Sequence, residues 1–265
     1  MEDPIERSVL FLGLARWLRH ENLDYIEIRP RELLCGDIPS LIQSTSNQCN
    51  HDLDLTPELD TVFRNFHKDC TQRKIRRAER EGLTYQEGRS RSLLDTFLRL
   101  YVRTRKQHLA PPQPRRWFEN LIAYLGEAIK IRVAFKAEQA LAAIVTLRHK
   151  KTLVYKYGCS DPALRNLGGT HGLLWRCIAE AKREGLQTFD LGRSDPGNLG
   201  LLKFKDRWNA KRSVLTYSRY TRSDSSKNNY REGVDRKKEL VKRLVSRLPD
   251  KVFCSVGDLL YRHIG

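Results

Sequence analysis

The spacing of apolar residues changes in a regular way through the middle of the chain. Apolar residues recur at every third or fourth position across residues 94–101 and again across 117–125, which predicts two amphipathic helices. From 129 to 135 they alternate with polar residues, as in a half-buried strand. Two further strand-like runs, 141–147 and 152–157, follow after short polar turns. These three runs predict an antiparallel meander.

A glycine-containing loop at Leu167–Thr170 then leads into a second change of pattern. A helix is expected at 172–183 and a strand at 188–191, which ends at Gly192. A short helix within 192–208, a last strand at 213–220 and an earlier strand at 83–85 complete the set. The predicted order from Leu83 is β-α-α-β-β-β-α-β-α-β. The strand after the glycine loop can lie parallel to its neighbour, because a helix supplies the crossover.

The first eighty residues predict a smaller αβ piece followed by a long helix. Strands are expected at 25–28 and 51–55, a Gly/Pro/Ser/Asn-rich loop at 35–50, and a helix from Leu59 to Glu81. An earlier helix has an apolar face formed by Ile5, Val9, Leu12, Trp17 and Leu18. The four tryptophans, Trp17, Trp117, Trp175 and Trp208, are expected to anchor the core.

The pattern of the C-terminal residues predicts a linker followed by two amphipathic segments. The linker is the Ser/Asn/Lys-rich stretch 221–229, and Pro249 separates the two segments within 234–265. Their apolar and basic sides suit docking on an anionic membrane. The alternative is that they cover the domain's own core.

The composition indicates a folded domain with anionic partners. Lysine and arginine number 49 against 32 acidic residues, which leaves a formal charge of +17 and a pI near 9.8. Such a field attracts nucleic acid, nucleotide phosphates, acidic glycans or an anionic membrane. The start, Met1–Pro4, does not resemble a signal peptide and no run is long enough to span a membrane, so a cytoplasmic location is expected. The scattered cysteines and histidines lack metal-ligand spacing, so no metal is expected.

Four arginines of the predicted helix 59–81 fall on one helical face. Their spacing is i, i+3, i+4 and i+7; they are Arg73, Arg76, Arg77 and Arg80. Guanidinium groups match phosphate geometry, so this face is a candidate binding surface for an anionic substrate. The alternative is a solvated face whose charges pair with Glu79, Glu81 and neighbouring carboxylates.

Three segments together resemble the FemAB-like branch of the GNAT acyltransferases. They are Arg73–Gly82, Phe189–Arg193 and Gly200–Lys205, and the resemblance covers roughly residues 52–220. It implies an α/β fold with a mixed sheet, in which a GNAT-like domain follows part of a second GNAT-like half. The expected division is 1–58 for the partial N-terminal half, 59–220 for the acyltransferase domain and 221–265 for the linker and basic amphipathic helices.

The glycine loop is the first candidate site. Amide groups at a helix N-terminus, next to glycines that allow close approach, can bind phosphate oxygens. The loop is also similar to the coenzyme A loop of GNAT enzymes, matching it at Arg165 and Gly168, with Gly169 between and Thr170 at the last position. FemAB-like relatives often lose this coenzyme A site because their donor is aminoacyl-tRNA. The alternative is a turn that only needs glycines.

The second candidate site follows the strand at 188–191. Ligands of α/β folds sit at the carboxyl ends of parallel strands, where neighbouring strands separate. Asp190 or Asp195 could there orient or deprotonate an amine, although each could equally serve only a cap or turn. Arg193 is a further candidate for binding an anionic substrate, in addition to the four arginines of the predicted helix 59–81. The resemblance further implies that Lys205 stabilises charge on the reacting acyl group.

The resulting hypothesis is direct transfer of an acyl or aminoacyl group to an amine, without a covalent enzyme intermediate. The donor would be acyl-CoA or aminoacyl-tRNA, with no tightly bound cofactor. The acceptor would be a cell-wall precursor or an amino sugar of a surface polysaccharide, either free or lipid-linked. A lipid-linked acceptor would bring the protein into peripheral contact with the inner face of the membrane. The alternative is a catalytically reduced basic protein that binds RNA or an anionic membrane surface.

Overall fold

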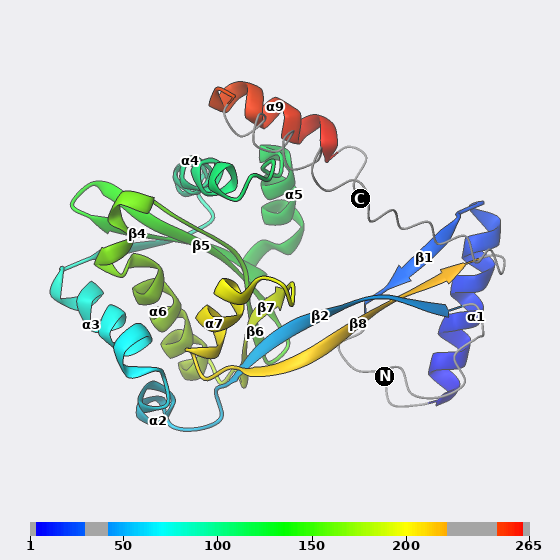
Figure 1. Ribbon diagram of the computed structural model, residues 1–265, viewed down its shortest axis with the longest axis horizontal. Helices are drawn as coiled ribbons and strands as arrows, with labels where there is room; N and C mark the ends of the chain where they lie inside the picture. Colours follow the sequence, from blue (N-terminus) through cyan, green and yellow to red (C-terminus); the bar gives the residue numbers. More distant parts are fainter. Residues whose placement is uncertain (1–3, 30–41, 222–247, 262–265) are drawn as a thin grey trace. The chain divides into compact units, whose positions relative to one another are not determined.

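The computed structural model describes residues 4–29, 42–221 and 248–261, which fall into two compact units. The first unit is formed by the described parts of Met1–Asn50, Arg193–Lys203 and Arg212–Arg231. The second and larger unit is formed by the described parts of His51–Gly192, Phe204–Lys211 and Glu232–Gly265. Figure 1 shows the elements along the chain.

Eight strands form a mixed sheet in the order β1-β8-β2-β7-β6-β5-β4-β3. Strands β3 to β6 pair antiparallel in sequence, and β7 lies parallel to β6. The mixed α/β fold and the strand-helix order predicted from Leu83 are therefore confirmed. The strands are β1 (Tyr25–Ile28), β2 (Ile42–Asp54), β3 (Thr84–Gly88), β4 (Ile129–Lys136), β5 (Gln139–His149), β6 (Thr152–Ser160), β7 (Thr188–Ser194) and β8 (Lys211–Thr221).

Helices cover both faces of the sheet in the larger unit (Figure 1). One face carries α3 (Arg73–Arg80) and α6 (Gly169–Arg183), and the other carries α4 (Arg91–Gln107) and α5 (Arg115–Leu125). The remaining helical elements are α1 (Pro4–His20), α2 (Leu59–Arg64), η1 (Lys68–Gln72), η2 (Gly126–Ala128), η3 (Pro162–Leu167), α7 (Leu199–Asp206) and α9 (Asp250–Leu260).

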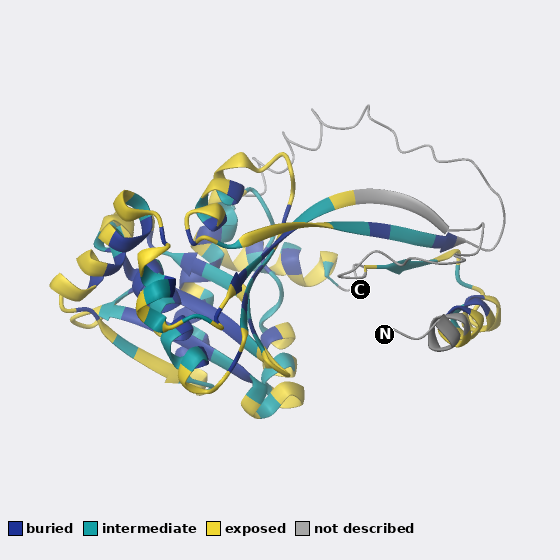
Figure 2. Cartoon of the chain, turned by 90° about the horizontal axis from the view of Figure 1, so that it is seen from below, coloured by how far each residue is buried: buried dark blue, intermediate teal, exposed yellow. Residues whose placement is uncertain are grey.

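Strand β5 is buried along most of its length because helices lie over both of its faces. Ala142 and Ile144 belong to the core beneath α6, whereas Ala143 and Val145 belong to the core beneath α4. Successive side chains of a strand point to opposite faces, so one apolar run supplies both cores. Figure 2 shows this buried centre of the larger unit in dark blue.

The single helix predicted from Leu59 to Glu81 is wrong, because the chain breaks it after α2. Phe66 turns into the core, and the amide of His67 donates to the Arg207 carbonyl at 3.0 Å instead of to a helical carbonyl. The side-chain amide of Gln72 donates to the carbonyl of Phe66 at 2.8 Å. A single π turn, η1, then leads into α3. Tertiary hydrogen bonds thus replace the local helical ones.

The predicted loop 35–50 is also wrong from Ile42 onward, where β2 begins. Its sequence is largely polar and shows no alternation that would indicate a strand. Its neighbours in the sheet are β8 and β7, which come more than 130 residues later in the chain. Strands far apart in sequence therefore decide the conformation of this segment.

The expected apolar face of α1 is confirmed only in part. Leu18 is buried and packs with Ala15 against Tyr220 of the first unit's sheet, whereas Val9, Leu12 and Trp17 are exposed. Trp117 is exposed as well, so two of the four tryptophans are not the core anchors expected, while Trp208 is fully buried. Across the described ranges, no helix is both long and apolar enough to cross a bilayer.

Helix α9 packs on its own domain, against the connection between α4 and α5. The side chain of Phe253 is fully buried, and a Cβ placed on Gly257 would lie 2.2 Å from the carbonyl oxygen of Pro112. The Lys106 ammonium donates to the Leu248 carbonyl at 2.7 Å. The core-covering alternative therefore holds for this helix. Residues 222–247, which contain the other amphipathic segment and most of the linker, lie outside the described residues.

Candidate active site at the separation of two parallel strands

Strands β6 and β7 begin side by side and then separate. Their parallel pairing runs from Thr152↔Thr188 to Val154↔Asp190, although β6 continues to Ser160. Immediately after the last pair, the register between β5 and β6 shifts, so that Lys156 has no partner of its own. Such a bulge bends a strand and increases its twist. The bulge therefore accounts for the separation expected near the end of β7.

Lys205 lies at this separation. Its side chain is 2% exposed, and its ammonium donates to the carbonyl oxygen of Gly192 at 2.7 Å. Gly192 adopts a left-handed φ of 75°, which turns the chain at the carboxyl end of the pairing. A buried ammonium needs such a partner, because an unpaired charge in the interior is costly. This burial excludes the interpretation of Lys205 as one more solvent-facing lysine among its basic neighbours.

The carboxylates of Asp190 and Asp195 both shape turns. Asp190 accepts from the Gly192 amide at 2.6 Å, and Asp195, in the first unit, accepts from the Gly197 amide at 2.7 Å. Each is an Asx turn, in which a side chain fixes the backbone two residues onward. The turn-forming interpretation is therefore observed for both. Their action on an amine stays a prediction.

The glycine loop packs tightly on the rest of the protein. Gly168 has a φ of 82°, and a Cβ there would lie 2.3 Å from the Lys74 carbonyl oxygen of α3. A Cβ on Gly169 would lie 3.3 Å from the side chains of Leu141 and Ala142 on β5. Close helix packing is thus sufficient to explain both glycines. The guanidinium of Arg165 donates to the side chain of Gln107, and Thr170 is half-buried at the start of α6.

The four arginines of α3 do lie on its exposed side, as the spacing predicted. The guanidinium of Arg77 pairs with Glu81 at 2.6 Å, and that of Arg76 lies 5.6 Å from the ring centroid of Phe63. The solvated interpretation therefore accounts for Arg77. Binding of an anionic substrate stays a prediction for this face.

Arg193 lies in the first unit, on the ring of Tyr217. Its guanidinium carbon is 5.6 Å from the ring centroid and a guanidinium N–H donates to the tyrosine hydroxyl. Contacts of this kind hold an arginine side chain in place on an aromatic ring.

The ring of His171 is buried in the core, against Phe204 and Trp208. It stacks on Trp208 with centroids 5.6 Å apart, and it meets the edge of Phe204 at the same distance. Burial, assisted by the nearby charges of Lys74 and Arg207, lowers the pKa of His171 to about 3. The imidazole is therefore neutral in the folded protein at ordinary pH.

This lowered pKa predicts a loss of stability in mild acid. Below about pH 6.5 the unfolded chain binds a proton that the folded His171 does not, so stability falls as the pH drops from 6.5 towards 3. We expect His171→Phe to reduce the slope of unfolding free energy against pH in this window by up to about 1.4 kcal/mol per unit. Urea unfolding at several pH values measures it. Exposed His149→Gln is the control, and an unchanged slope in His171→Phe would contradict the prediction.

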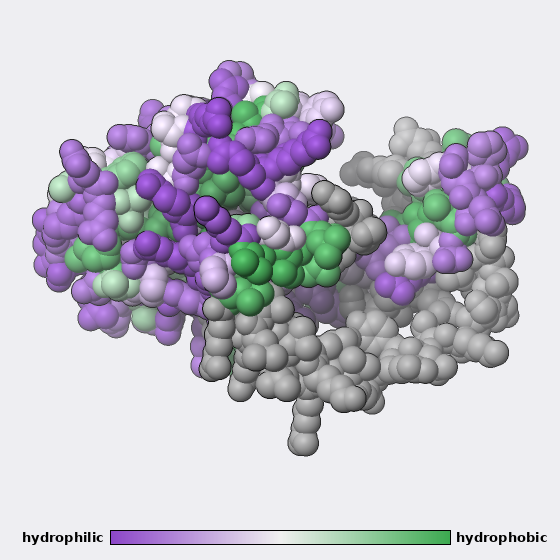
Figure 3. All heavy atoms as spheres, turned by 90° about the horizontal axis from the view of Figure 1, so that it is seen from above, coloured by the Kyte–Doolittle hydropathy of each residue, from purple (hydrophilic) through white to green (hydrophobic). Residues whose placement is uncertain are grey.

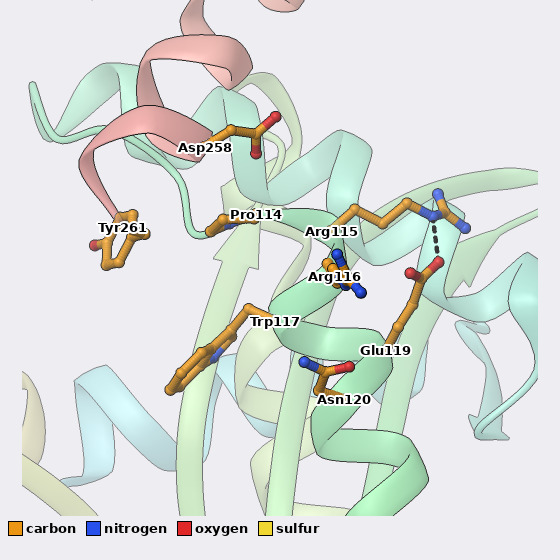
Figure 4. Close-up of a pocket in the computed structure, with 8 residues that line it drawn as sticks. All are labelled: Pro114, Arg115, Arg116, Trp117, Glu119, Asn120, Asp258 and Tyr261. Atoms are coloured by element: carbon orange, nitrogen blue, oxygen red, sulfur yellow. Dashed lines mark hydrogen bonds and ion pairs between the residues drawn. The ribbon is translucent and has the colours of Figure 1, made fainter. Parts of the chain in front are cut away.

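A pocket of about 600 Å³ lies elsewhere in the larger unit, between α5 and α9 (Figure 4). Trp117 comes from α5, whereas Asp258 comes from α9 and Tyr261 from its C-terminal end (Figure 4). The indole N–H of Trp117 donates to the hydroxyl of Tyr157 on β6 at 2.9 Å. No sequence signal identified this pocket, because its walls come from helices more than 120 residues apart.

Three comparisons with known proteins agree with this geometry. Residues 66–206 match the family model described as "Acetyltransferase (GNAT) domain". A curated relative, UDP-N-acetylmuramoylpentapeptide-lysine N(6)-alanyltransferase of Weissella viridescens, is 27% identical over 111 residues. That match covers 41% of this chain and 33% of the relative, so the chain corresponds to about a third of that protein.

Two solved structures share the fold. FemX superposes with a TM-score of 0.68 at 15% identity, over 81% of this chain and 76% of FemX. The C-terminal domain of a putative lysylphosphatidylglycerol synthetase from Agrobacterium fabrum gives 0.58 at 16% identity, over 80% and 72%. Within the described ranges, no group of three or more candidate metal ligands occurs. The chain belongs to the GNAT acetyltransferase family, and its fold is that of the FemAB-like acyltransferases.

Proposed function

We propose that the protein transfers an acyl or aminoacyl group from an activated donor directly to an amine. The observation that carries this proposal is the buried Lys205 ammonium on the Gly192 carbonyl, at the point where β6 and β7 cease to pair. We infer that the donor carbonyl sits where this pairing ends, since ligands of α/β folds bind at the carboxyl ends of parallel strands. A fixed positive charge at that point is suited to a developing oxyanion, because electrostatic stabilisation is strongest where water is excluded.

The proposed reaction has one chemical step. The amine nitrogen attacks the donor carbonyl, a C–N bond forms, and the donor's oxygen or sulfur leaves and is protonated. The amine must lose one proton, and Asp190 or Asp195 is the proposed orienting or accepting group. A thiol nucleophile does not suit this core, since burial raises the pKa of Cys177 to about 12 and raises that of Cys159 as well. This supports direct transfer.

The exposed arginines of α3 support a phosphate-rich donor. Arg73, Arg76 and Arg80 present guanidinium groups on the surface of the larger unit. The glycines at the start of α6 are already explained by packing on α3 and β5. We therefore favour aminoacyl-tRNA over acyl-CoA as the donor. Coenzyme A on the Arg165–Thr170 loop is the alternative, which the GNAT family membership favours.

The relatives suggest the kind of acceptor. The curated relative's name describes alanyl transfer to the lysine N6 amine of a UDP-N-acetylmuramoyl pentapeptide, and one structural neighbour is a putative lysylphosphatidylglycerol synthetase. Both names describe aminoacyl transfer in the making of envelope components. We propose an amine of a cell-wall precursor, or an amino sugar of a surface polysaccharide, as the acceptor of this chain.

A stability screen with donors tests the proposal. Aminoacyl-tRNA is expected to raise the Tm more than uncharged tRNA, and acetyl-CoA serves as the competing donor. Changing Arg73, Arg76 and Arg80 together to glutamine should weaken tRNA binding, because phosphate contacts dominate affinity for nucleic acid. The matched control removes three other exposed charges of the same unit, with Arg91, Arg148 and Arg183 changed to glutamine.

The outcomes separate the proposal from its alternative. Salt-dependent binding of charged and uncharged tRNA alike, with no shift by any acyl donor, would show a binding protein that lacks catalysis. Equal weakening by the two triple variants would remove α3 as the donor surface.

A further inference from the structure

Helix α1 has apolar side chains on two opposite sides. One side carries Phe11, Ala15 and Leu18, which recur at helical spacing and are all buried. Ala15 and Leu18 pack against Tyr220 of β8. The sheet of the first unit therefore accounts for this side, as expected for an amphipathic helix of a folded domain.

The opposite side, which we call the outer face of α1, is exposed. It is formed by Val9, Leu12, Gly13, Arg16 and Trp17, whose spacing is i, i+3, i+4, i+7 and i+8. The exposed fractions are 63% for Val9, 67% for Leu12 and 54% for Trp17. Figure 3 shows green apolar side chains between purple hydrophilic ones on this unit. Several large apolar side chains grouped on one exposed face indicate an interaction site.

The outer face of α1 is cationic as well as apolar. Arg16 lies on this face and Arg19 at its edge, and both are exposed. From Ser8 to its end at His20, the helix contains no acidic residue. Among the described residues, no carboxylate forms an ion pair with Arg16 or Arg19. Apolar and tryptophan side chains next to arginines are typical of helices that lie in a membrane interface.

Charge distinguishes α1 from α9, which also has exposed apolar side chains. Helix α9 exposes Val252 and Leu259, but it carries the carboxylates of Asp250 and Asp258 as well. An anionic lipid surface would repel these carboxylates, whereas it would attract the arginines of α1. The two helices therefore differ in the partner that each suits.

We propose that the outer face of α1 docks on an anionic lipid bilayer, with the helix lying in the plane of the interface. Val9 and Leu12 enter the acyl boundary, Trp17 lies at the headgroup level, and the arginines contact lipid phosphates. A second copy of the chain suits this face less well, because pairing two such faces would bring like charges together. The inference rests on α1 alone and goes beyond the proposed transfer reaction.

Co-sedimentation of the full chain with lipid vesicles tests the apolar contribution. The vesicles contain phosphatidylglycerol and phosphatidylcholine in equal parts. Leu12→Gln and Trp17→Gln are each expected to weaken binding about 10-fold, since each removes one large side chain from the acyl boundary. Tyr124→Gln is the matched control, because Tyr124 is 87% exposed on α5 and should not contribute.

The same assay tests the ionic contribution. Arg16→Gln and Arg19→Gln are each expected to weaken binding to these vesicles about 5-fold, the contribution of one basic residue close to an anionic membrane. Neither should change the weaker binding to vesicles of pure phosphatidylcholine. Arg183→Gln is the control, because it removes an equal charge from the exposed side of α6 in the other unit.

A gain of affinity is expected from Gly13, which lies on the outer face. A Cβ placed there would meet nothing within 4 Å, so the helix can accept a larger side chain at this position. Gly13→Leu should tighten vesicle binding about 10-fold, because it adds an apolar side chain to the docking face. Gly13→Gln is the control, since glutamine favours a helix about as much as leucine does but adds no apolar group.

Three results would overturn the proposal. Equal weakening by Leu12→Gln and Tyr124→Gln, or by Arg16→Gln and Arg183→Gln, would indicate attraction by the net charge of the chain. Equal affinities of the two Gly13 variants would show that the outer face does not enter the bilayer. A dimer in solution that Trp17→Gln dissociates, with vesicle binding unchanged, would assign the face to a second copy of the chain.

Two controls keep these results separate from folding and from the transfer reaction. Unchanged Tm values in the α1 variants establish that an altered affinity reflects the face itself. Lys205→Met should bind vesicles as the unaltered chain does. Loss of transfer in a variant that still binds vesicles therefore leaves this proposal intact, and the failure of vesicle binding leaves the proposed reaction intact.

Discussion

Replacing Lys205 by methionine is expected to reduce acyl transfer about 100- to 1,000-fold. Removal of a single group aimed at a developing oxyanion has an effect of this size in other acyl-transfer sites. Methionine preserves the length and apolar stem of the side chain but removes the ammonium that lies 2.7 Å from the Gly192 carbonyl oxygen. The measurement is the rate of transfer with the donor that the stability screen selects.

The same substitution is also expected to lower the Tm, because it leaves the partly buried Gly192 carbonyl without this donor. A lost partner of this kind costs about 1–3 kcal/mol. Lys203→Met is the matched control, since Lys203 lies two residues earlier on α7 and is exposed. If Lys205→Met transferred at the normal rate, Lys205 would be a structural lysine only.

Gly168→Ala is expected to be among the most destabilising single changes in the larger unit. Alanine at a φ of 82° is strained by about 1–2 kcal/mol. Its Cβ would also lie 2.3 Å from the backbone carbonyl oxygen of Lys74, and overpacking of a core typically costs about 1–3 kcal/mol more. Urea or thermal unfolding of the purified variant measures the combined effect.

Gly82→Ala provides the control for backbone strain alone. Gly82 also has a left-handed φ, of 63°, but a Cβ there would meet nothing within 4 Å. Its loss of stability should therefore be limited to the conformational part, about 1–2 kcal/mol. Equal losses in the two variants would show that α3 and α6 separate readily at this point, which would contradict the tight packing of the glycine loop.

The Gly168→Ala and Gly82→Ala variants also test whether Gly168 serves helix packing or donor binding. If Gly168 served only phosphate binding, its replacement would reduce donor affinity with little effect on stability. The close approach of Gly168 to the Lys74 carbonyl oxygen predicts instead a large loss of stability, with a smaller effect on donor affinity. The Arg165–Thr170 loop would then contribute to the site by holding α6 against α3.

The sequence by itself determined the elements whose apolar pattern is strong and local. The meander β4–β5–β6, the crossover helix α6 and the parallel strand β7 were all predicted, because burial on defined faces imposes periods of two or about 3.6. The exposed arginine face of α3 followed from the same periodicity. Three short segments around Arg73, Asp190 and Lys205 indicated the family.

Tertiary structure decided what depends on partners distant in the chain. The polar strand β2 forms beside β8, and the break between α2 and α3 forms where His67 reaches Arg207. The burial of Lys205, the pairing of Glu27 with Arg219 and the pocket between α5 and α9 join residues 13 to more than 190 positions apart. Periodicity describes which side of an element is apolar, but only the assembled fold determines what lies against it.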